Sequence, residues 1–599
     1  MMHRTALTQR LFRKNAVWFL GALFCTIACV LLDYLIPLVL AETLDHYLGG
    51  KPSVLPAFMS DWTGVYGDPD YVVRHLYLVG IAIVALNLLN GVFSYGKGRF
   101  QAMAGENVSR DLRDMLYDHI QRLPFSYHMQ AKTGDLVQRC TSDVDTVRRF
   151  LAMQLMSVVN ALFMIVTALV ILFSKNIRLT LLSMLMVPAL FLFAFLFFKW
   201  VITAFRASDE AEGRMSAVLQ ENLTGVRVVR AFGRQAYEID KFNEKVTDLA
   251  DKNFRVNLLL AIYWATGDLL SMTQSMITLL CCLSAAISGE ITLGVLVIYT
   301  TYVGKLLFPI RQLGRILSDA GKSMVALDRI RQILDEPAEP EEKDGLKPDL
   351  TGDIEFDHVT FGYGGEPVLR DLCMTIRSGE TVAILGSTGS GKSTLAQLLQ
   401  RLFPLEKGDI RIGGVSIRSI DRAWLRQHVG LVLQDPFLYS RTIRENVTMA
   451  RSDIDTAEID RAVRDAGALQ FILESEKGYD TVVGERGVTL SGGQKQRLAI
   501  ARTLLKDSSI LIFDDSLSAV DTQTDAEIRA ALKRRQKDMT TIIISHRVNT
   551  LKDADRIFVL EDGHVTQQGT HDELIHEEGL YRRVFQIQTS LENELLSEV

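Results

Sequence analysis

The sequence predicts two parts of different fold class, an α-helical domain that crosses a membrane six times and an α/β domain that follows it. The first prediction rests on the uneven spread of apolar residues in a 599-residue chain that is 48% hydrophobic. Stretches of about 20 apolar residues, long enough to cross a bilayer, do not occur after residue 320. The second prediction rests on short β-rich runs that alternate with helical patterns from Asp353 onward. We expect a transmembrane domain over residues 1–335, a linker over 336–351 and the α/β domain over 352–599.

Six apolar stretches predict the membrane-crossing helices. Two of the segments between them are about 50 residues long and contain few Pro or Gly residues. Each can therefore form two helices of roughly 35 Å, at 1.5 Å per residue, that continue the spans into the cytoplasm and meet at a short turn. Ordinary amphipathic loop helices are the alternative. The turns are expected over 123–135 and 221–225, and the spans near 16–40, 72–95, 151–173, 177–202, 257–287 and 291–313.

Basic residues predict how these spans are oriented. Both long segments are rich in Lys and Arg, whereas the segment from Asp45 to Tyr71, between the first two spans, carries four acids and only one lysine, Lys51. Positive residues accumulate on the cytoplasmic side of membrane proteins. We therefore expect both termini and the α/β domain in the cytoplasm of a cell with the spans in its inner or plasma membrane. The acids of the outer segment are Asp45, Asp61, Asp68 and Asp70.

The segment from Asp335 to Gly345 differs from both neighbouring parts of the chain. It is acidic, contains two prolines and has few large apolar residues. Such a composition is typical of a solvated linker. The formal net charge of the whole chain is -6, which gives no reason to expect nucleic acid as a partner.

A glycine-rich motif opens the α/β domain directly after the apolar run Val382–Leu385. Every fixed position of the phosphate-binding loop pattern is filled between Gly386 and Ser393. The glycines allow backbone N–H groups to surround phosphate oxygens, Lys392 reaches the outer phosphates, and the Ser393 hydroxyl can bind Mg²⁺. A chance glycine-rich turn is the alternative, but it does not explain the preceding strand and the lysine in register. The predicted ligand is ATP or another nucleoside triphosphate, bound by Gly386, Ser387, Thr388, Gly389, Ser390, Gly391, Lys392 and Ser393, with Thr394 next in the helix.

Two further motifs of this domain predict a metal ligand and a second anion site. The apolar run Ile510–Phe513 ends in Asp514 and Asp515, and a buried strand that ends in an acid beside a phosphate loop is suited to organise Mg²⁺. Asp514 is therefore a candidate metal ligand together with Ser393. The pentapeptide Leu490–Gln494 precedes a helical pattern, so its small residues expose a second helix N-terminus to phosphate.

Over about 240 positions these motifs resemble the nucleotide-binding domain of ABC transporters. Together with the six spans, the whole chain resembles an exporter-type half-transporter of the multidrug and lipid exporter group. The resemblance implies that Tyr363 stacks on adenine, that Gln434 touches Mg²⁺ and senses the attacking water, and that His546 lies beside the γ-phosphate. It also implies that Asp521 belongs to a loop that carries signals between paired domains.

The same resemblance implies that one chain does not act alone. In the family arrangement, ATP is bound between the phosphate loop of one nucleotide-binding domain and the signature segment of another, which corresponds to Leu490–Gln494 in this chain. Ser491, Gly492, Gly493 and Gln494 would therefore contact the nucleotide of a partner half-transporter. The closing and opening movements of the two domains would be transmitted to the spans through the cytoplasmic tips, which are the turns expected over 123–135 and 221–225.

Asp515 departs from the family pattern, which has glutamate directly after the Mg²⁺ aspartate to polarise the attacking water. The side chain of aspartate is one methylene, about 1.5 Å, shorter, and a general base acts only within about 2.6–3.2 Å of its proton source. We expect the chain's own site, with Asp515, Gln434 and His546 as its catalytic residues, to hydrolyse ATP weakly. This favours a heterodimer with a partner that carries the glutamate. A homodimer in which aspartate suffices is the alternative.

Ionisable residues inside the predicted spans are candidates for a transport cavity, because they are costly in a membrane. Asp33, Asp268 and Lys305 are the charged ones, and a purely structural pairing is the alternative role. The leading functional prediction is ATP-driven export of hydrophobic or amphipathic substrates, such as drugs, lipids or peptides. A homodimeric lipid flippase and a non-pumping ATP-binding subunit of a membrane complex are the other hypotheses.

Overall fold

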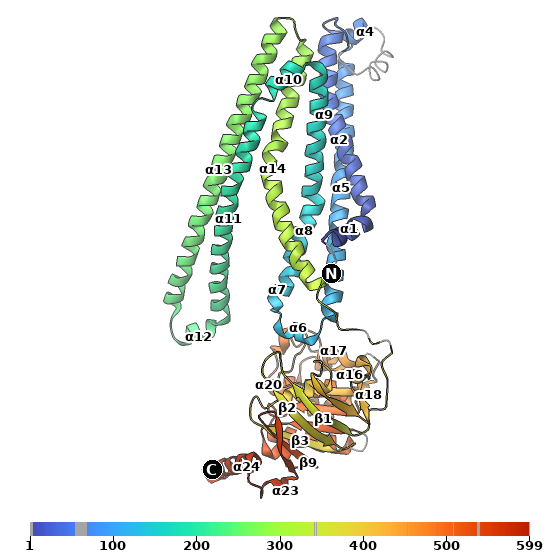
Figure 1. Ribbon diagram of the computed structural model, residues 1–599, viewed down its shortest axis with the longest axis vertical. Helices are drawn as coiled ribbons and strands as arrows, with labels where there is room; N and C mark the ends of the chain where they lie inside the picture. Colours follow the sequence, from blue (N-terminus) through green and yellow to red (C-terminus); the bar gives the residue numbers. More distant parts are fainter. Residues whose placement is uncertain are drawn as a thin grey trace. The chain divides into compact units, whose positions relative to one another are not determined.

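The computed structural model describes residues 4–53, 69–340, 342, 344–451, 453–506, 508–535 and 539–597. The chain forms two compact units (Figure 1). The first contains Met1–Leu123 and Ala131–Pro337, and the second contains Pro124–Gln130 and Ala338–Val599. The expected domain limits at residues 335 and 352 stay a prediction.

The first unit is α-helical, as the sequence predicts. Five of its described helices are long and apolar enough to cross a membrane: Ala16–Tyr47, Tyr77–Arg122, Thr133–Lys175, Ile177–Thr224 and Gln235–Ile287. A shorter apolar helix, Leu293–Pro309, lies where the sixth span is expected, so the count of six stays a prediction. The elements are α1 (Arg4–Lys14), α2 (Ala16–Glu42), η1 (Thr43–Tyr47), α4 (Pro69–Arg74), α5 (Tyr77–Arg122), α7 (Thr133–Gln138), η3 (Arg139–Asp143), α8 (Val144–Arg149), η4 (Phe150–Gln154), α9 (Leu155–Lys175), α10 (Ile177–Ser183), α11 (Val187–Thr224), α12 (Val226–Ala231), α13 (Gln235–Ile287) and α14 (Leu293–Leu334).

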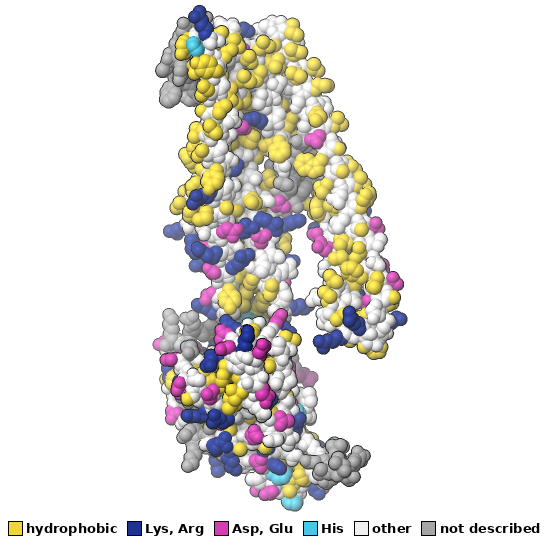
Figure 2. Space-filling model, turned by 180° about the vertical axis from the view of Figure 1, so that it is seen from behind, with side chains coloured by type: hydrophobic (Ala, Val, Ile, Leu, Met, Phe, Trp, Pro, Cys, Tyr) yellow, Lys and Arg dark blue, Asp and Glu magenta, His cyan; other side chains and the backbone are white. Residues whose placement is uncertain are grey.

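The long basic segments form continuations of the apolar helices rather than separate loop helices. α5 has 46 residues and α13 has 53, which corresponds to about 70–80 Å at 1.5 Å per residue. Figure 2 shows hydrophobic side chains over the upper part of this unit and many charged side chains over its lower part. The second tip differs from the expected turn, because α11 runs on to Thr224 and the short helix α12 follows it. Most of the acidic segment between the first two spans, residues 54–68, lies outside the described residues.

The fourth apolar stretch is not one straight helix. α10 ends at Ser183 and α11 begins at Val187, with Pro188 in its first turn. The interruption leaves backbone groups without helical partners, which is tolerated in a membrane only where another group satisfies them. Gln274 of α13 does so, since its side-chain oxygen accepts a 2.7 Å hydrogen bond from the Met186 N–H. Gln274 is fully buried, so it serves the packing of α10, α11 and α13.

A buried carboxylate joins the ends of α2 and α14. Asp45 lies in η1, directly after α2, and is 2% exposed. It accepts a 2.9 Å hydrogen bond from the Gly294 N–H in the first turn of α14 and a short one from the Thr292 hydroxyl. A Cβ at Gly294 would overlap this carboxylate, so glycine is needed for the close approach. Asp45 therefore caps α14.

The second unit is an α/β domain with two sheets. The six-stranded sheet has the order β10-β9-β3-β8-β7-β6. Its strands β9, β3, β8, β7 and β6 are parallel to one another, and β10 is antiparallel to β9. The four-stranded antiparallel sheet has the order β2-β1-β4-β5. The strands are β1 (Ile354–Phe361), β2 (Leu369–Ile376), β3 (Thr381–Gly386), β4 (Lys407–Ile412), β5 (Val415–Ser416), β6 (Val429–Val432), β7 (Ile510–Asp514), β8 (Thr540–Ile544), β9 (Arg556–Glu561) and β10 (His564–Gly569). The helices are α6 (Phe125–Gln130), α15 (Lys392–Leu399), α16 (Arg422–His428), α17 (Ile443–Val447), η5 (Thr448–Ala450), α18 (Thr456–Asp465), α19 (Leu469–Glu474), η6 (Gly478–Asp480), η7 (Glu485–Gly487), α20 (Gly492–Leu504), α21 (Thr522–Arg535), α22 (Val548–Leu551), α23 (His571–Leu574) and α24 (Leu580–Ser597).

The parallel strands are buried on both faces. On β3, Ala383 and Leu385 pack into one hydrophobic core, whereas Val382 and Ile384 pack into the other. This explains why the strand before the phosphate loop is continuously apolar instead of alternating.

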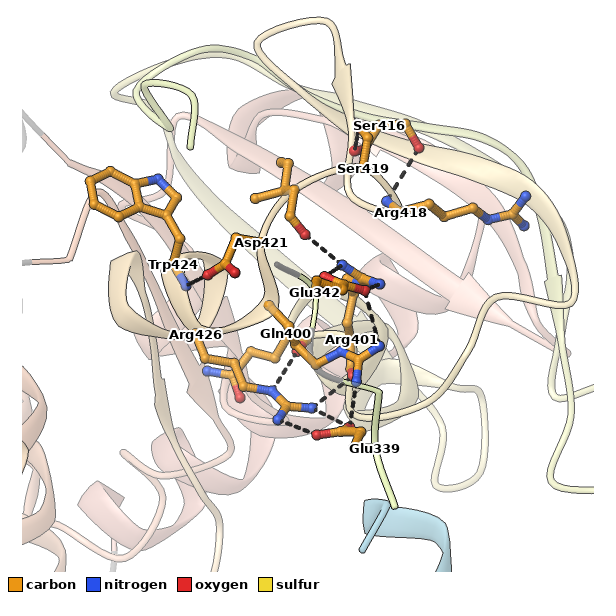
Figure 3. A network of polar contacts seen from close by, with 12 residues as sticks. Glu339, Glu342, Gln400, Arg401, Ser416, Arg418, Ser419, Asp421, Trp424 and Arg426 are labelled. Carbon is orange, nitrogen blue, oxygen red and sulfur yellow. Dashed lines mark hydrogen bonds and ion pairs between the residues drawn. The ribbon is translucent and has the colours of Figure 1, made fainter. Parts of the chain in front are cut away.

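The part of the acidic segment from Ala338 onward belongs to the second unit, and two of its carboxylates bind arginines there instead of being solvated (Figure 3). Glu339 accepts two hydrogen bonds, of 2.8 and 2.9 Å, from the Arg426 guanidinium, and Glu342 accepts two, of 2.6 and 3.1 Å, from Arg401. Arg422 contacts both carboxylates. Partial burial opposes ionisation of Glu339, but the Arg426 hydrogen bond and the charges of Arg426 and Arg422 outweigh it and lower the pKa of this carboxyl. Composition alone did not reveal these partners because they lie about 60–90 residues further along the chain.

The cap on α14 gives a first prediction. Asp45→Ala leaves the Gly294 N–H without its acceptor, and loss of a helix cap costs about 1–2 kcal/mol. We expect a lower thermal unfolding midpoint of the purified protein in detergent. Asp240→Ala removes an exposed aspartate of α13 and is the control. Equal midpoints for the two variants would contradict the capping role of Asp45.

Candidate nucleotide-binding site

The phosphate loop and the two acidic residues meet at one edge of the parallel sheet. The loop follows β3, and Asp514 is the last residue of β7, with β8 between the two strands. The carboxyl ends of parallel strands lie at the same edge, which is where α/β domains bind ligands. The residues that the sequence predicts from two distant motifs are therefore neighbours in space.

The loop has a backbone conformation that requires glycine. Gly389 and Gly391 have φ values of +85° and +101°, in the region that side chains disfavour. A Cβ at Gly391 would lie 2.5 Å from the Leu369 side chain, and one at Gly386 would overlap the Leu560 carbonyl. Ser387, Thr388 and Gly389 are exposed, so an anion can reach the backbone N–H groups of the loop.

Lys392 and Ser390 show that the loop is built for a ligand. The Lys392 ammonium is almost buried and donates hydrogen bonds to the carbonyls of Gly386, at 2.9 Å, and Ser387, at 2.7 Å. Burial lowers the pKa of Lys392, and the nearby Asp515 and Asp514 oppose that shift. The buried Ser390 hydroxyl has no hydrogen-bond partner among the described residues. A phosphate oxygen would satisfy both groups.

Ser393 and Asp514 form the candidate Mg²⁺ site. The Ser393 hydroxyl donates a 2.9 Å hydrogen bond to the Asp514 carboxylate, and burial raises the pKa of Asp514. No group of three or more His, Cys, Asp or Glu residues in the described part of the chain forms a metal site of its own. Two oxygen ligands nevertheless fit Mg²⁺, which usually takes one or two protein carboxylates and completes its shell with phosphate oxygens and water. A cation here would also compensate the buried charge of Asp514.

Asp515 lies next to the predicted water-sensing residue. The Gln434 side-chain amide donates a 3.2 Å hydrogen bond to one Asp515 oxygen, and the other oxygen is buried without a partner among the described residues. The Asp515 backbone has φ of +46°, a region in which aspartate is tolerated better than longer side chains. The unpartnered oxygen is available to accept a hydrogen bond from a water molecule.

His546 follows β8 at the same edge of the sheet. The Ile544 carbonyl, at the end of this strand, accepts a 2.9 Å hydrogen bond from the Asp515 N–H. His546 comes two residues later, and its side chain is exposed. Its backbone carbonyl accepts a 2.7 Å hydrogen bond from Gln588 of α24, which fixes the loop that carries it.

Tyr363 presents a half-exposed ring beside α15. Its hydroxyl is held by Thr394, at 3.0 Å, and by Gln397, at 2.9 Å. The ring lies edge-on to Phe361 and Phe403, with centroid distances of 5.2 and 5.1 Å. One face is thereby left for a flat apolar ligand such as a nucleobase.

Sequence reasoning did not identify Phe403 and Phe125 as parts of this site. The ring of Phe125, in α6, lies 5.5 Å from that of Phe403, which also contacts Tyr363. α6 follows α5, the second of the membrane-length helices. Neither phenylalanine lies in a motif, so the only available signal was the position of Phe403 shortly after the phosphate-loop helix.

The signature segment forms a second helix N-terminus in the same domain. Ser491 caps α20, its hydroxyl accepting from the Gln494 N–H at 3.3 Å while the Gln494 side chain accepts from the Ser491 N–H at 2.9 Å. This reciprocal capping box fixes the exposed residues Ser491 and Gly492 at the helix start. Asp521 caps α21 in a similar way, and its hydrogen bonds from the Thr524 N–H and hydroxyl lower its pKa.

Comparison with protein families identifies both parts of the chain. Residues 19–310 match the family model of the ABC transporter transmembrane region, and residues 369–518 match the ABC transporter family model. An ABC transporter ATP-binding protein of Bacillus subtilis, YknU, is 32% identical over 96% of this chain and 95% of that protein. The chain belongs to the ABC transporter family. Membership establishes an ATP-binding domain fused to a multi-pass transmembrane domain.

Other relatives of this ABC transporter have more specific names. A putative multidrug export ATP-binding/permease protein of Bacillus subtilis, YgaD, is 33% identical and covers 94% of this chain and 97% of its own. An ATP-dependent lipid A-core flippase of Dechloromonas aromatica is 33% identical over 90% of this chain and 92% of that protein. The solved structure of a bacterial Atm1-family ABC exporter with ATP bound is 26% identical, with a TM-score of 0.81 over 96% of this chain and 99% of that one.

The geometry of the phosphate loop gives a second prediction. Gly391→Ala forces a side chain into a disfavoured φ and against Leu369, which costs about 1–3 kcal/mol. We expect a lower unfolding midpoint and a smaller stabilisation by added ATP. The control is Gly365→Ala, at an ordinary φ with open space around the position. A Gly391→Ala protein with undiminished ATP stabilisation would contradict the assignment of this loop.

Proposed function

We propose that this chain is one half of a dimeric ABC exporter that moves hydrophobic or amphipathic substrates across a membrane by alternating access. The observation that carries the proposal is the hydrogen bond between Ser393 and Asp514 at the sheet edge, in a chain whose other unit consists of membrane-length helices. The names of the multidrug and lipid-transporting relatives support the substrate class. We further propose that the protein lies in a cell inner or plasma membrane with both termini and the nucleotide-binding domain in the cytoplasm.

The residues of the phosphate loop and its surroundings have distinct proposed roles. Backbone N–H groups from Gly386 to Gly391 and the Lys392 ammonium bind the phosphates of ATP. Ser393, Asp514 and Gln434 hold Mg²⁺, which supplies electrostatic stabilisation of the phosphates when it is bound. Tyr363 stacks on the base, and Asp515, oriented by Gln434, is the acceptor for a proton of the attacking water.

The second anion site explains why a partner chain is proposed. The capping box leaves the N-terminus of α20 free to meet an anion, and a helix N-terminus favours negative charge. We propose that this segment completes the ATP site of a partner half-transporter. ATP would then stabilise the closed pair of domains, and hydrolysis would release them.

Coupling to the membrane domain is proposed to run through α6. The rings of Tyr363, Phe403 and Phe125 form a continuous set of contacts from the predicted base-binding face to this helix. α6 is covalently continuous with α5, the second membrane-length helix. A movement of Tyr363 on nucleotide binding would therefore reach α5 through packed aromatic side chains.

Asp515 supports a heterodimer over a homodimer. Because the carboxylate is one methylene shorter than glutamate, its proton acceptor lies farther from a water at the γ-phosphate. The site would then bind ATP and hydrolyse it weakly, and the partner's site would supply most of the turnover. The same feature is the one observation that favours the second candidate function, an ATP-binding subunit that regulates a membrane complex without pumping.

ATP turnover of the chain purified alone tests the role of Asp515. We expect weak turnover with intact ATP binding, and a rise of about tenfold or more in Asp515→Glu, because one well-positioned general base contributes about 10²–10⁴-fold. Asp562→Glu is the matched control, since Asp562 also has a positive φ, of 49°, and is exposed. It reports the strain of glutamate in this backbone region without touching the site. Brisk hydrolysis by the unaltered chain alone would reject the heterodimer argument.

Export itself is tested with inside-out vesicles that contain this chain and a partner half-transporter carrying glutamate at the equivalent position. We expect ATP-dependent accumulation of a fluorescent amphiphile, lost in Lys392→Met. ATP binding without accumulation, whichever partner is supplied, would support the non-pumping candidate instead.

A further inference from the structure

The membrane domain contains an ion pair that the nucleotide site does not explain. The Lys305 ammonium of α14 lies 2.7 Å from the Asp33 carboxylate of α2, and it also donates a 2.9 Å hydrogen bond to the Asp33 backbone carbonyl. The sequence singles out both residues as intramembrane charges, together with Asp268. Asp33 pairs with Lys305 across two helices that are far apart in the sequence.

Both charges lie well inside the membrane-length helices, at a distance from the helix ends that is about half the thickness of a bilayer core. Asp33 is nine residues before the end of α2, about 14 Å along the helix, and Lys305 is twelve residues after the start of α14, about 18 Å. These two helix ends lie on the same side, because Asp45 joins them. The hydrocarbon core of a bilayer is about 30 Å thick, and a charge at its centre is costly and marks a functional site by default.

The pair is only partly covered within the chain. The Asp33 side chain is 39% exposed and that of Lys305 is 27% exposed. The flanking residues Tyr34 and Leu306 are buried in the hydrophobic core of the helical unit. A pair that served only to hold α2 against α14 would be expected to lie inside this core, as Tyr34 does. The pair instead borders it and is partly exposed within the single chain.

Two prolines add backbone acceptors at the same point. A proline lacks the N–H that would bond to the carbonyl four residues earlier. Pro37 in α2 thus leaves the Asp33 carbonyl without its helical donor, and Lys305 takes that role. Pro309 in α14 stands four residues after Lys305 and removes the corresponding bond to the Lys305 carbonyl. Each charged residue therefore coincides with an opened turn of its helix.

An aromatic wall supports one side of the pair. The Lys305 ammonium lies 5.7 Å from the centre of the Tyr34 ring, and this ring packs edge-on against Tyr302 at 4.6 Å. Both tyrosines are almost fully buried, and their hydroxyls donate hydrogen bonds to the Met164 and Tyr34 carbonyls respectively. The wall is held rigidly, so a ligand has to approach from the open side.

We propose that Asp33 and Lys305 form a binding site for the headgroup of an amphipathic substrate that carries both a primary ammonium and a phosphate. On binding, the substrate's ammonium pairs with Asp33 and its phosphate with Lys305, so the ion pair opens and two new ones replace it. This inference rests on the proposed export function and specifies the substrate class.

Charge balance explains why the proposed ligand carries both a positive and a negative group. A purely cationic or anionic ligand would pair with one residue and leave the other charge uncompensated in a low-dielectric environment, which disfavours binding by about a hundredfold or more. A zwitterion keeps every charge paired. The same argument disfavours uncharged amphiphiles, because they cannot replace the attraction between Asp33 and Lys305.

Hydrogen-bond chemistry explains why the cation is a primary ammonium. When Lys305 turns to the phosphate, the Asp33 carboxylate and the Asp33 carbonyl freed by Pro37 both lack a donor. An –NH₃⁺ group has three N–H donors and satisfies them together. A trimethylammonium group has the same charge but no N–H donor, so it leaves the carbonyl unsatisfied, which costs about tenfold or more in affinity.

The test compares two phospholipids with identical acyl chains. The purified full chain in detergent is titrated with phosphatidylethanolamine or phosphatidylcholine, and bound lipid is counted by native mass spectrometry. We expect at least about tenfold tighter binding of phosphatidylethanolamine. The double variant Asp33→Asn with Lys305→Gln should lose this preference, whereas Lys199→Met, which removes an exposed lysine of α11 in the fourth apolar stretch, should keep it.

A charge exchange separates recognition from a structural lock. Asp33→Lys with Lys305→Asp retains an ion pair between α2 and α14 but moves the carboxylate away from the residue-33 backbone carbonyl that Pro37 leaves without its helical donor. Loss of the preference with an unchanged unfolding midpoint supports the binding site. Equal binding of the two lipids by the unaltered chain, or a preference retained in the exchanged pair, would overturn the inference. ATP-dependent accumulation of a fluorescent amphiphile in vesicles is measured in parallel, so failure of export and failure of headgroup recognition give different results.

Discussion

The structure of the nucleotide-binding unit depends on the parallel pairing of β3, β8 and β7. This pairing brings the phosphate loop and Asp514, which are more than 100 residues apart, to a single 2.9 Å hydrogen bond between Ser393 and Asp514. Hydrophobic cores on both faces of the sheet hold the strands in register. Without that register, the buried charges of Lys392 and Asp514 would have no common ligand, and their burial would only destabilise the domain.

In both units, charged side chains that are removed from water have partners, and many of these partners come from distant parts of the chain. The carboxylates after α14 are bound by arginines from the loop after α15 and from α16, and Asp33 in the membrane domain is bound by Lys305. Arginine suits the first case because its planar guanidinium forms two parallel bonds to a carboxylate. Lysine suits the second, because a single flexible ammonium can leave one acceptor for another. The choice of arginine agrees with a fixed attachment of the carboxylates after α14. The choice of lysine agrees with an ion pair between Asp33 and Lys305 that a ligand can replace.

The interruptions of the membrane helices also depend on polar partners from distant parts of the chain. The break before α11 is satisfied by Gln274, the start of α14 is capped by Asp45, and the carbonyl opened by Pro37 is bound by Lys305. In a bilayer no water is available to satisfy such groups. Each of these three sites is therefore satisfied by a polar side chain from another part of the helical unit, and the contacts join α13 to the break between α10 and α11 and join α2 to α14.

The sequence alone determined the two fold classes, and it indicated the phosphate loop, Asp514 as a candidate metal ligand and the signature segment. These features are local: they depend on apolar run length, on glycines at fixed spacing and on a residue at a strand end. It did not determine the partners of the acidic segment, the pairing of Asp33 with Lys305, the break before α11 or the contacts of Phe125 and Phe403. Each of these depends on which distant segments pack together, and no local pattern encodes the partner. The tertiary structure decided them because burial of a polar or charged group, or a close ring contact, is fixed only when both sides are in place.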